Sequence, residues 1–340
     1  MTIFRRYILA TVLAVSAIAA LAQDGTSAYS FLNISSSARI HGLGGMNISL
    51  VDDDITVVGL NPSLLGSEMS NTVAFSYMRY LGNSNFAGLR YAHSARERGA
   101  WSVNMDYLGY GSIKETLPDG TVAGDFSPKD IIFGGTYSHD ITDRLRGGIN
   151  VKGVYSSYAD FSAFAISTDL GINYYVPEKD LSLSLVLANL GGQVKRFSER
   201  YNRLPFDVRV GWSQSFGSFP VRFSVTAWNL TKWSSPYIQA GDGMDNAEEV
   251  VKESFTRNLF RHLVFGADLV ASPNYYISIG YNYRTRTDMS TYSRSFLSGF
   301  SLGGGFKVKS LALSLAYAQP HKGGSTIMFN ISYNFNDLIN

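Results

Sequence analysis

Apolar and polar residues alternate in the C-terminal part of the chain. From Leu311 to Tyr317, leucine and tyrosine occupy one set of alternate positions, and alanine and serine occupy the other. The segment from Ile327 to Phe335 repeats this pattern, with Ile, Phe and Tyr on one face and Met, Asn and Ser on the other. Successive side chains of a β-strand point to opposite faces. The pattern therefore predicts two strands, each with one apolar face.

The same alternation predicts twelve more strands, so we expect fourteen in all. The apolar faces often end in Tyr, Trp or Phe, and the opposite faces carry small and polar residues. A soluble β-sandwich would alternate in the same way, but its solvated faces would carry charged residues. The pattern instead favours an all-β fold, a 14-stranded antiparallel transmembrane β-barrel in the cell outer membrane, where barrels of bacterial single chains have even strand numbers. The twelve further segments are residues 71–80, 85–94, 100–110, 130–139, 144–155, 164–176, 180–188, 206–216, 221–228, 259–270, 274–283 and 296–308.

The lengths of the connections support this strand count and indicate an orientation. Outer-membrane barrels have short periplasmic turns and longer extracellular loops. If the first strand runs outward, the periplasmic end receives only short turns, near residues 95–98, 140–143, 177–179, 217–220, 271–273 and 309. The other end receives the longest connections, which are residues 111–129, 189–205, 230–258 and 284–295.

Charged residues within the predicted strands lie opposite the apolar row. A charge facing lipid near mid-bilayer would cost about 2 to 4 kcal/mol, so these side chains should point into the lumen. They could line a polar conduit or form internal ion pairs that hold the barrel and its contents together. The second interpretation is favoured because buried charges are usually paired. The residues are Arg90, Asp106, Arg146, Lys152, Asp169, Arg209, Arg222 and Asp268.

The N-terminus has the composition of a secretory signal peptide. Two arginines precede an apolar run from Tyr7 to Leu21, and small residues flank a cleavage position after Ala22. A membrane anchor is the alternative, but this run is shorter than the ~20 residues that a spanning helix needs. We therefore predict a signal peptide at residues 1–22, an N-terminal hatch at 23–70 and the barrel at 71–340.

The hatch prediction depends on residues 35–66, which keep neither a helical nor a strand period. An irregular segment that precedes a closed wall of strands is expected to fill the lumen as a plug. Its glycines would let the backbone turn tightly. The run Asp52-Asp53-Asp54 is interpreted as a solvated turn, because it lacks the spacing of a calcium loop.

Composition and motifs argue against catalysis, cofactor binding and nucleic-acid binding. The chain has 16% charged residues, a formal net charge of +2 and no cysteine. The charge balance does not suggest a nucleic-acid partner. Without cysteine there is no thiolate metal site or cysteine nucleophile, and the five histidines show no metal-ligand spacing. No nucleophile elbow or nucleotide-binding loop is present. We predict a protein that is not an enzyme and has no catalytic residues, metal or cofactor.

The longest connection, residues 230–258, is a candidate partner loop. Its segment AEEVVKESF predicts a short amphipathic helix that would cap the pore or dock a partner. An ordinary outer loop is the equally weighted alternative. The candidate contact residues are Asp242, Glu248, Glu249 and Phe255.

The stretch from Ser37 to Ser63 resembles the opening of the FadL-like outer-membrane proteins. It contains Ser-Ala-Arg, then Gly-Leu-Gly-Gly, an acidic turn and Asn-Pro-Ser. The resemblance extends from about residue 26 to the C-terminus, and it implies an N-terminal hatch inside a fourteen-stranded barrel. Ser63 stands where alanine is usual, and Phe335 would replace a terminal aromatic residue as the assembly signal. The residues of the hatch motif are Ala38, Arg39, Gly42, Gly44, Gly45, Asn61 and Pro62.

Within that superfamily, length and strand layout are similar to the barrels of the type IX secretion system of Bacteroidota, a group that includes PorV. This resemblance implies a non-enzymatic outer-membrane component of the attachment complex. Such a component would anchor or scaffold the surface protein PorZ, with PorU and PorV as further partners, so that cargo is attached to lipopolysaccharide at the cell surface. The alternative is a FadL-like channel for hydrophobic small molecules.

Overall fold

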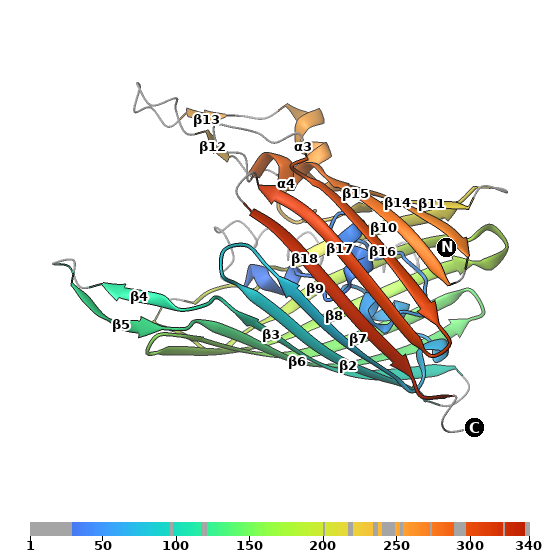
Figure 1. The fold of residues 1–340 in the computed structure, drawn as a ribbon, viewed down its shortest axis with the longest axis horizontal. Helices are drawn as coiled ribbons and strands as arrows, with labels where there is room; N and C mark the ends of the chain where they lie inside the picture. The colour runs from blue at the N-terminus through green and yellow to red at the C-terminus, as the bar shows by residue number, and fades with distance from the viewer. Residues whose placement is uncertain are drawn as a thin grey trace, which may run out of the picture.

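A closed barrel of fourteen antiparallel strands forms the body of the protein (Figure 1). The computed structural model describes residues 29–95, 98–116, 118, 121–199, 201–216, 220–233, 237–239, 249–251, 254–272, 274–288, 297–321 and 324–336. The predicted signal peptide lies outside these residues. The predicted fold class and strand number are confirmed.

Each barrel strand pairs with its neighbours along the chain, and the first strand closes the barrel against the last. In order around the wall the strands are β1 (Thr72–Arg79), β2 (Asn85–Ala95), β3 (Gly99–Gly109), β6 (Lys129–Thr142), β7 (Leu145–Tyr158), β8 (Phe161–Val176), β9 (Leu181–Lys195), β10 (Asp207–Ser215), β11 (Val221–Ala227), β14 (Leu263–Ser272), β15 (Tyr275–Asn282), β16 (Phe300–Val308), β17 (Leu311–His321) and β18 (Gly324–Asn334).

The outer face of the wall is apolar and the inner face is polar. Leu89 and Ile277 are exposed on the outer face, whereas their strand neighbours Arg90 and Ser278 are buried inside. A hydrocarbon environment on the outside explains this distribution, since backbone groups are satisfied within the closed ladder and lipid covers the apolar side chains. The protein is an outer-membrane barrel. Within the described residues, no helix has the length and apolar character to cross a membrane.

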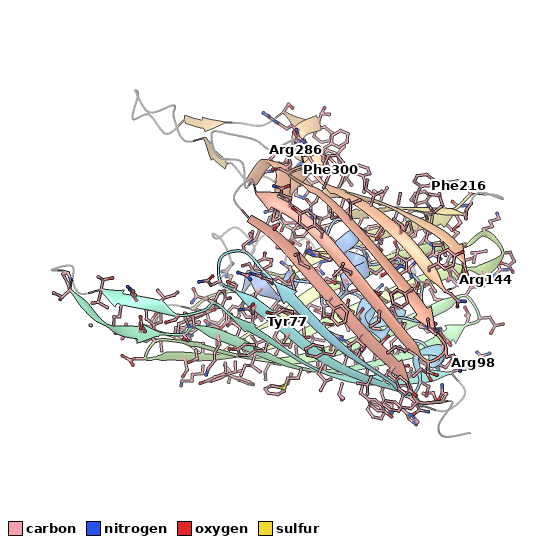
Figure 2. All side chains as sticks on the ribbon, in the orientation of Figure 1. Tyr77, Arg98, Arg144, Phe216, Arg286 and Phe300 are labelled. Atoms are coloured by element: carbon pink, nitrogen blue, oxygen red, sulfur yellow. The ribbon has the colours of Figure 1, made fainter. Side chains whose placement is uncertain are left out.

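The two ends of the barrel differ. One end, here called the short-turn end, carries brief connections such as residues 143–144 and 309–310. At the opposite, long-loop end, one connection contains the hairpin of β4 (Ile113–Thr116) and β5 (Val122–Phe126). Another contains β12 (Tyr237–Gln239), β13 (Glu249–Val251) and α3 (Phe255–Arg261), and a third contains α4 (Tyr283–Asp288). Figure 2 places Arg98 and Arg144 toward the short-turn end and Arg286 and Phe300 toward the long-loop end.

Three predicted boundaries at the long-loop end were wrong. The strand expected from residue 259 begins at Leu263, because residues 255–261 form α3, whose first turn is capped by the Ser254 side chain. The helix expected within AEEVVKESF does not form at residues 249–251, which the structure describes as strand β13. The strand expected from residue 296 begins at Phe300, after Gly299 with φ of +87°. The strand expected to end at residue 188 continues to Lys195, past an irregular pairing with β8.

Residues 29–70, here called the interior segment, lie inside the barrel (Figure 1). They form only short helical turns: η1 (Ser30–Asn33), α2 (Ala38–Gly42), η2 (Ile55–Gly59), η3 (Pro62–Leu64) and η4 (Ser67–Met69). Side chains of Ser37, Asp54 and Asn61 accept hydrogen bonds from the backbone amides of Ile40 in α2, Thr56 in η2 and Ser63 in η3. These capping residues are the local reason that each turn starts where it does.

Candidate functional site

Two cavities lie between the interior segment and the wall. The larger, here called the upper cavity, has a volume of about 530 Å³ and lies toward the long-loop end. The smaller, here called the lower cavity, has a volume of about 90 Å³ and lies toward the short-turn end. A volume of 300 to 1,000 Å³ is typical of small-molecule sites. The upper cavity is therefore the candidate binding site.

The lining of the upper cavity combines apolar side chains with polar ones, and it includes the cations Lys232 and Arg284. Phe31, Ile34 and Met46 come from the interior segment, and the ends of the strands contribute Met78, Leu108, Trp228, Phe300 and Ala318. His41 lies at its base, where its Nε2 is 2.7 Å from the Thr326 hydroxyl. Loss of hydration lowers the pKa of His41 to about 4, so the imidazole is neutral near pH 7. The neutral base and the apolar part of the lining suit an apolar ligand.

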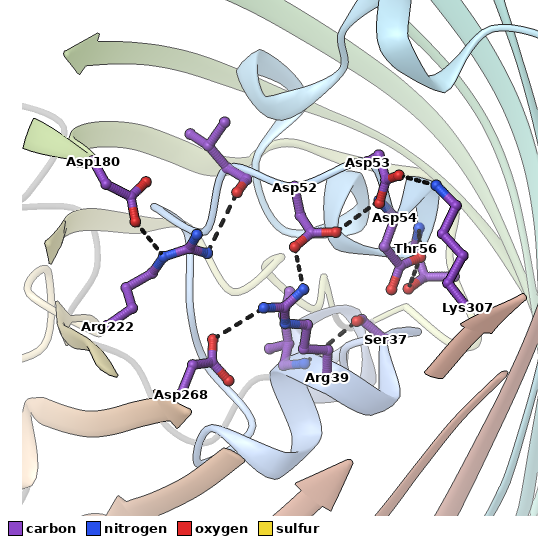
Figure 3. Close-up of polar contacts among 12 residues, drawn as sticks. Ser37, Arg39, Asp52, Asp53, Asp54, Thr56, Asp180, Arg222, Asp268 and Lys307 are labelled. Carbon is purple, nitrogen blue, oxygen red and sulfur yellow. Dashed lines mark hydrogen bonds and ion pairs between the residues drawn. The ribbon is translucent and has the colours of Figure 1, made fainter. Parts of the chain in front are cut away.

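The lower cavity is charged. Arg39 forms ion pairs with Asp52 of the interior segment and with Asp268 of β14, and its Nη2 is 3.5 Å from the Asp268 carboxylate (Figure 3). Asp53 pairs with Lys307 of β16. Burial acts to raise the pKa of Asp52, but the positive charges of Arg39 and Arg222 and hydrogen bonds from Asp53 and the Asp54 amide together lower that pKa below its ordinary value. Burial raises the pKa of Asp54, which lacks such a partner and instead caps η2 through Thr56.

The interpretation of the aspartate run as a solvated turn was therefore wrong. Asp52 joins the interior segment to itself and, through Arg39, to the wall, and Asp53 makes a direct contact with the wall. No local pattern indicates these contacts, because Asp268 and Lys307 are more than 200 residues away along the chain. Among the residues that the structure describes, no cluster of His, Asp or Glu is arranged to hold a metal ion.

The other wall charges are also paired inside the barrel, as the ion-pair interpretation predicts. The distances between the charged atoms are 3.5 Å for Arg90 and Asp106, 2.8 Å for Lys152 and Asp169, 3.0 Å for Arg209 and Asp207, 3.0 Å for Arg222 and Asp180, and 2.5 Å for Arg146 and Asp140. Arg146 also reaches Glu68 of the interior segment at 3.3 Å.

Glycines of the hatch motif meet glycines of the wall. A Cβ added at Gly42 would lie 2.8 Å from the Gly303 Cα, and one added at Gly280 would lie 2.0 Å from the Gly44 nitrogen. Gly44 and Gly45 have φ of +94° and +81°, so these two do let the backbone turn, as predicted. Gly42 belongs to α2 and serves a different purpose, which is the close approach of the helix to the sheet.

The Asn-Pro-Ser motif contacts a different part of the wall in the same manner. A Cβ added at Gly148 of β7 would lie 2.4 Å from the carbonyl carbon of Pro62, and one added at Gly171 of β8 would lie 2.2 Å from the Asn61 Oδ1. Asn61 donates from Nδ2 to the Ile48 carbonyl oxygen at 2.7 Å and accepts from the Ser63 amide at 3.0 Å. The motif thus ties two turns of the interior segment together beside a flat patch of the wall.

Replacing Asn61 with alanine should lower the free energy of unfolding by about 1 to 3 kcal/mol, because the buried Ile48 carbonyl oxygen and Ser63 amide lose their partner. Denaturant titration in lipid vesicles would measure this. The matched control is Asn85→Ala, which removes an exposed hydrogen bond from the Tyr77 hydroxyl and should change stability by less than about 0.5 kcal/mol. Equal effects of the two substitutions would contradict the role assigned to Asn61.

The structure separates the predicted site residues into two groups. The hatch motif residues Ala38, Arg39, Gly42, Gly44, Gly45, Asn61 and Pro62 all lie in the interior segment, and Gly44 and Gly45 line the upper cavity. In the candidate partner loop, Asp242 and Glu248 lie outside the described residues, and Glu249 is described only as part of β13. Phe255 begins α3, is 71% exposed and packs against Trp233 with ring centroids 6.0 Å apart and ring planes tilted by 39°.

The apolar lining of the upper cavity was missed by sequence reasoning. Near the long-loop end, the otherwise polar inner faces of three strands each carry an apolar residue, which is Met78, Leu108 or Ala318. Such interruptions at the same height on several strands were the available signal. Their alignment becomes visible only once the register of all strands is known.

No protein-family model matches the chain, and no curated protein sequence matches it. Among solved structures, the toluene transporter TbuX of Ralstonia pickettii aligns with a TM-score of 0.53 and 12% identity, covering 88% of this chain and 97% of that one. The toluene transporter TodX of Pseudomonas putida aligns with a TM-score of 0.54 and 10% identity, covering 91% of this chain and 99% of that one. The CymD monoaromatic hydrocarbon channel aligns with a TM-score of 0.50 and 14% identity, covering 90% of this chain and 98% of that one.

These likenesses establish the fold. The barrel architecture implied by the sequence resemblance is confirmed at that level. None of the comparisons supports the narrower assignment to PorQ, the type IX secretion barrel that the sequence resembles, and that assignment stays a proposal.

Proposed function

We propose that the protein is an outer-membrane channel for hydrophobic small molecules and that the upper cavity is its binding site. The observation that carries the proposal is the cavity itself, about 530 Å³ in volume, with a lining that is apolar in large part and a neutral histidine at its base. Burial of apolar surface would supply most of the binding free energy. Three solved proteins with this fold are described as transporters or channels for toluene or monoaromatic hydrocarbons, which supports the same class of ligand.

Uptake of labelled toluene into liposomes that contain the purified barrel tests the proposal. Wild-type protein should accelerate uptake above that of empty liposomes. Ala318→Trp should reduce this acceleration, because Ala318 lines the upper cavity and an indole there would occupy much of it. The matched control is Ala87→Trp, which places the same side chain on the lipid face of β2, in register with Tyr107. Uptake no faster than in empty liposomes would reject the proposal.

A scaffold of the type IX attachment complex, as PorQ, is the second candidate. The observation that favours it is the size of the insertion between β11 and β14, which presents α3 and the exposed Phe255 at the long-loop end. Purification from outer membranes after crosslinking would recover PorZ, PorU or PorV if this role is correct. Recovery of none of them, with cargo attachment intact in a deletion strain, would reject it.

A further inference from the structure

The upper and lower cavities lie against the same part of the wall. On β16, Ser301 lines the upper cavity and Gly305 the lower one. On β17 the corresponding residues are Ala318 and Ser314, and on β18 they are Thr326 and Asn330. Because inward-facing positions alternate along a strand, a single inward position on each of β16 and β18 separates the two cavities. These positions are Gly303 and Met328, and Ala316 is the equivalent inward position on β17.

These three residues form a thin layer. Two residues of a strand rise by about 7 Å, so one inward position corresponds to about that thickness. Met328 is 0% exposed and Ala316 is 1% exposed, and neither lines a cavity. On the lumen side, α2 covers this layer. Ala38 of α2 packs in the same apolar cluster as Ala316 and Met328. Gly42 of α2 lies against Gly303.

The layer contains no charged side chain, and hydrogen bonds fasten α2 at its edges. The Ala38 amide donates to the Asn330 side chain on the lower side. On the upper side, the Ser301 hydroxyl donates to the Gly42 carbonyl oxygen at 2.8 Å and accepts from the Gly44 amide at 2.9 Å. Elsewhere the interior segment is thicker, since Ile48, Leu50, Ile55 and Val57 pack into a second apolar cluster against other strands.

We infer that the contact of α2 with Gly303, Ala316 and Met328 is the gate of the channel, and that its cargo passes between α2 and strands β16 to β18. This inference rests on the proposed function. An apolar layer excludes ions and water but offers no desolvation barrier to an uncharged hydrocarbon. For a hydrocarbon to pass, α2 has to separate from Gly303, Ala316 and Met328, whereas the rest of the interior segment stays in place.

The first test of the gate uses toluene uptake by variants. Met328→Ala removes packing that closes the layer and should raise the uptake rate about fivefold, the factor that about 1 kcal/mol makes in a rate. The matched control is Val186→Ala on β9, which is equally buried against the interior segment but lies away from the layer, and it should leave the rate unchanged. No increase with Met328→Ala, or an equal increase with Val186→Ala, would overturn the gate.

A disulfide tests which part of the interior segment moves. The hydroxyl oxygens of Ser49 and Ser213 are 2.5 Å apart, so Ser49→Cys/Ser213→Cys should tether the interior segment to β10. The oxidised variant should take up toluene at the wild-type rate, because the tether lies away from α2. Loss of uptake on oxidation and recovery on reduction would overturn the localisation to α2.

Thiol labelling tests the layer independently of transport, and the chain has no cysteine of its own. In β17, Ala318→Cys should react with an impermeant maleimide from the long-loop side and Ala312→Cys only from the short-turn side. Ala316→Cys should react from neither side. Labelling of Ala316→Cys from either side would show that the layer is not a barrier. Absence of toluene uptake by wild-type protein, together with the expected labelling, would reject the proposed function and leave the barrier in place.

Discussion

Arg39→Met should lower the free energy of unfolding by about 3 to 5 kcal/mol, the cost of removing one partner from a buried ion pair. Arg39 is the only basic group that joins Asp52 and Asp268 among the ion pairs of the described residues, and all three side chains are largely shielded from water. Methionine keeps most of the volume but leaves two carboxylates without their cation. Unfolding by denaturant in lipid vesicles, followed by tryptophan fluorescence, would measure the change.

The control for this prediction is Arg98→Met. Arg98 and Asp143 also form an ion pair, at 3.1 Å, but their side chains are 56% and 91% exposed. Exposed pairs contribute about 1 kcal/mol or less. Combining Arg39→Met with Asp52→Asn and Asp268→Asn should recover part of the lost stability, because the unpaired charges disappear. A loss in Arg39→Met no larger than in Arg98→Met would show that the ion pairs do not hold the interior segment.

The number of strands could be predicted because alternation is a local property. Each strand shows it independently of its neighbours, and a lipid environment enforces it strongly. The ends of the strands at the long-loop side could not be predicted in the same way. Leu259 and Phe260 continue the apolar pattern of β14, yet Ser254 caps a helical turn that includes them. A short helix and a short strand carry similar apolar runs, so the local pattern does not separate them.

The contacts of the interior segment could not be predicted because they depend on register across the whole barrel. Gly148, Gly171 and Gly280 stand in ordinary strand patterns, and nothing near them in the sequence marks them as contacts. In the folded chain they face turns of residues 29–70 at distances that exclude a side chain. The hatch motif could be recognised as a unit by resemblance, but the wall residues that receive it have no such signature.

Gly280→Ala should therefore displace α2 and destabilise the protein by about 3 kcal/mol or more, at the upper end of the cost of overpacking. The added Cβ would lie 2.0 Å from the Gly44 nitrogen and 2.2 Å from the Leu43 carbonyl carbon. Both are backbone atoms, so no side-chain rotation can relieve the overlap, and α2 has to move away from β15. Ion conductance across planar bilayers should rise, because the apolar layer between the two cavities would open.

Gly135→Ala is the matched control, since a Cβ at Gly135 of β6 would have no neighbour within 4 Å. Its conductance and stability should equal those of wild type to within about 0.5 kcal/mol. Gly148→Ala gives a second comparison, because it overlaps the Pro62 carbonyl carbon at 2.4 Å on another part of the wall. This variant should be destabilised to a similar extent, but its ion conductance should rise less, since η3 does not lie between the two cavities. Equal conductance of the two variants would mean that the whole interior segment, and not α2 alone, closes the lumen.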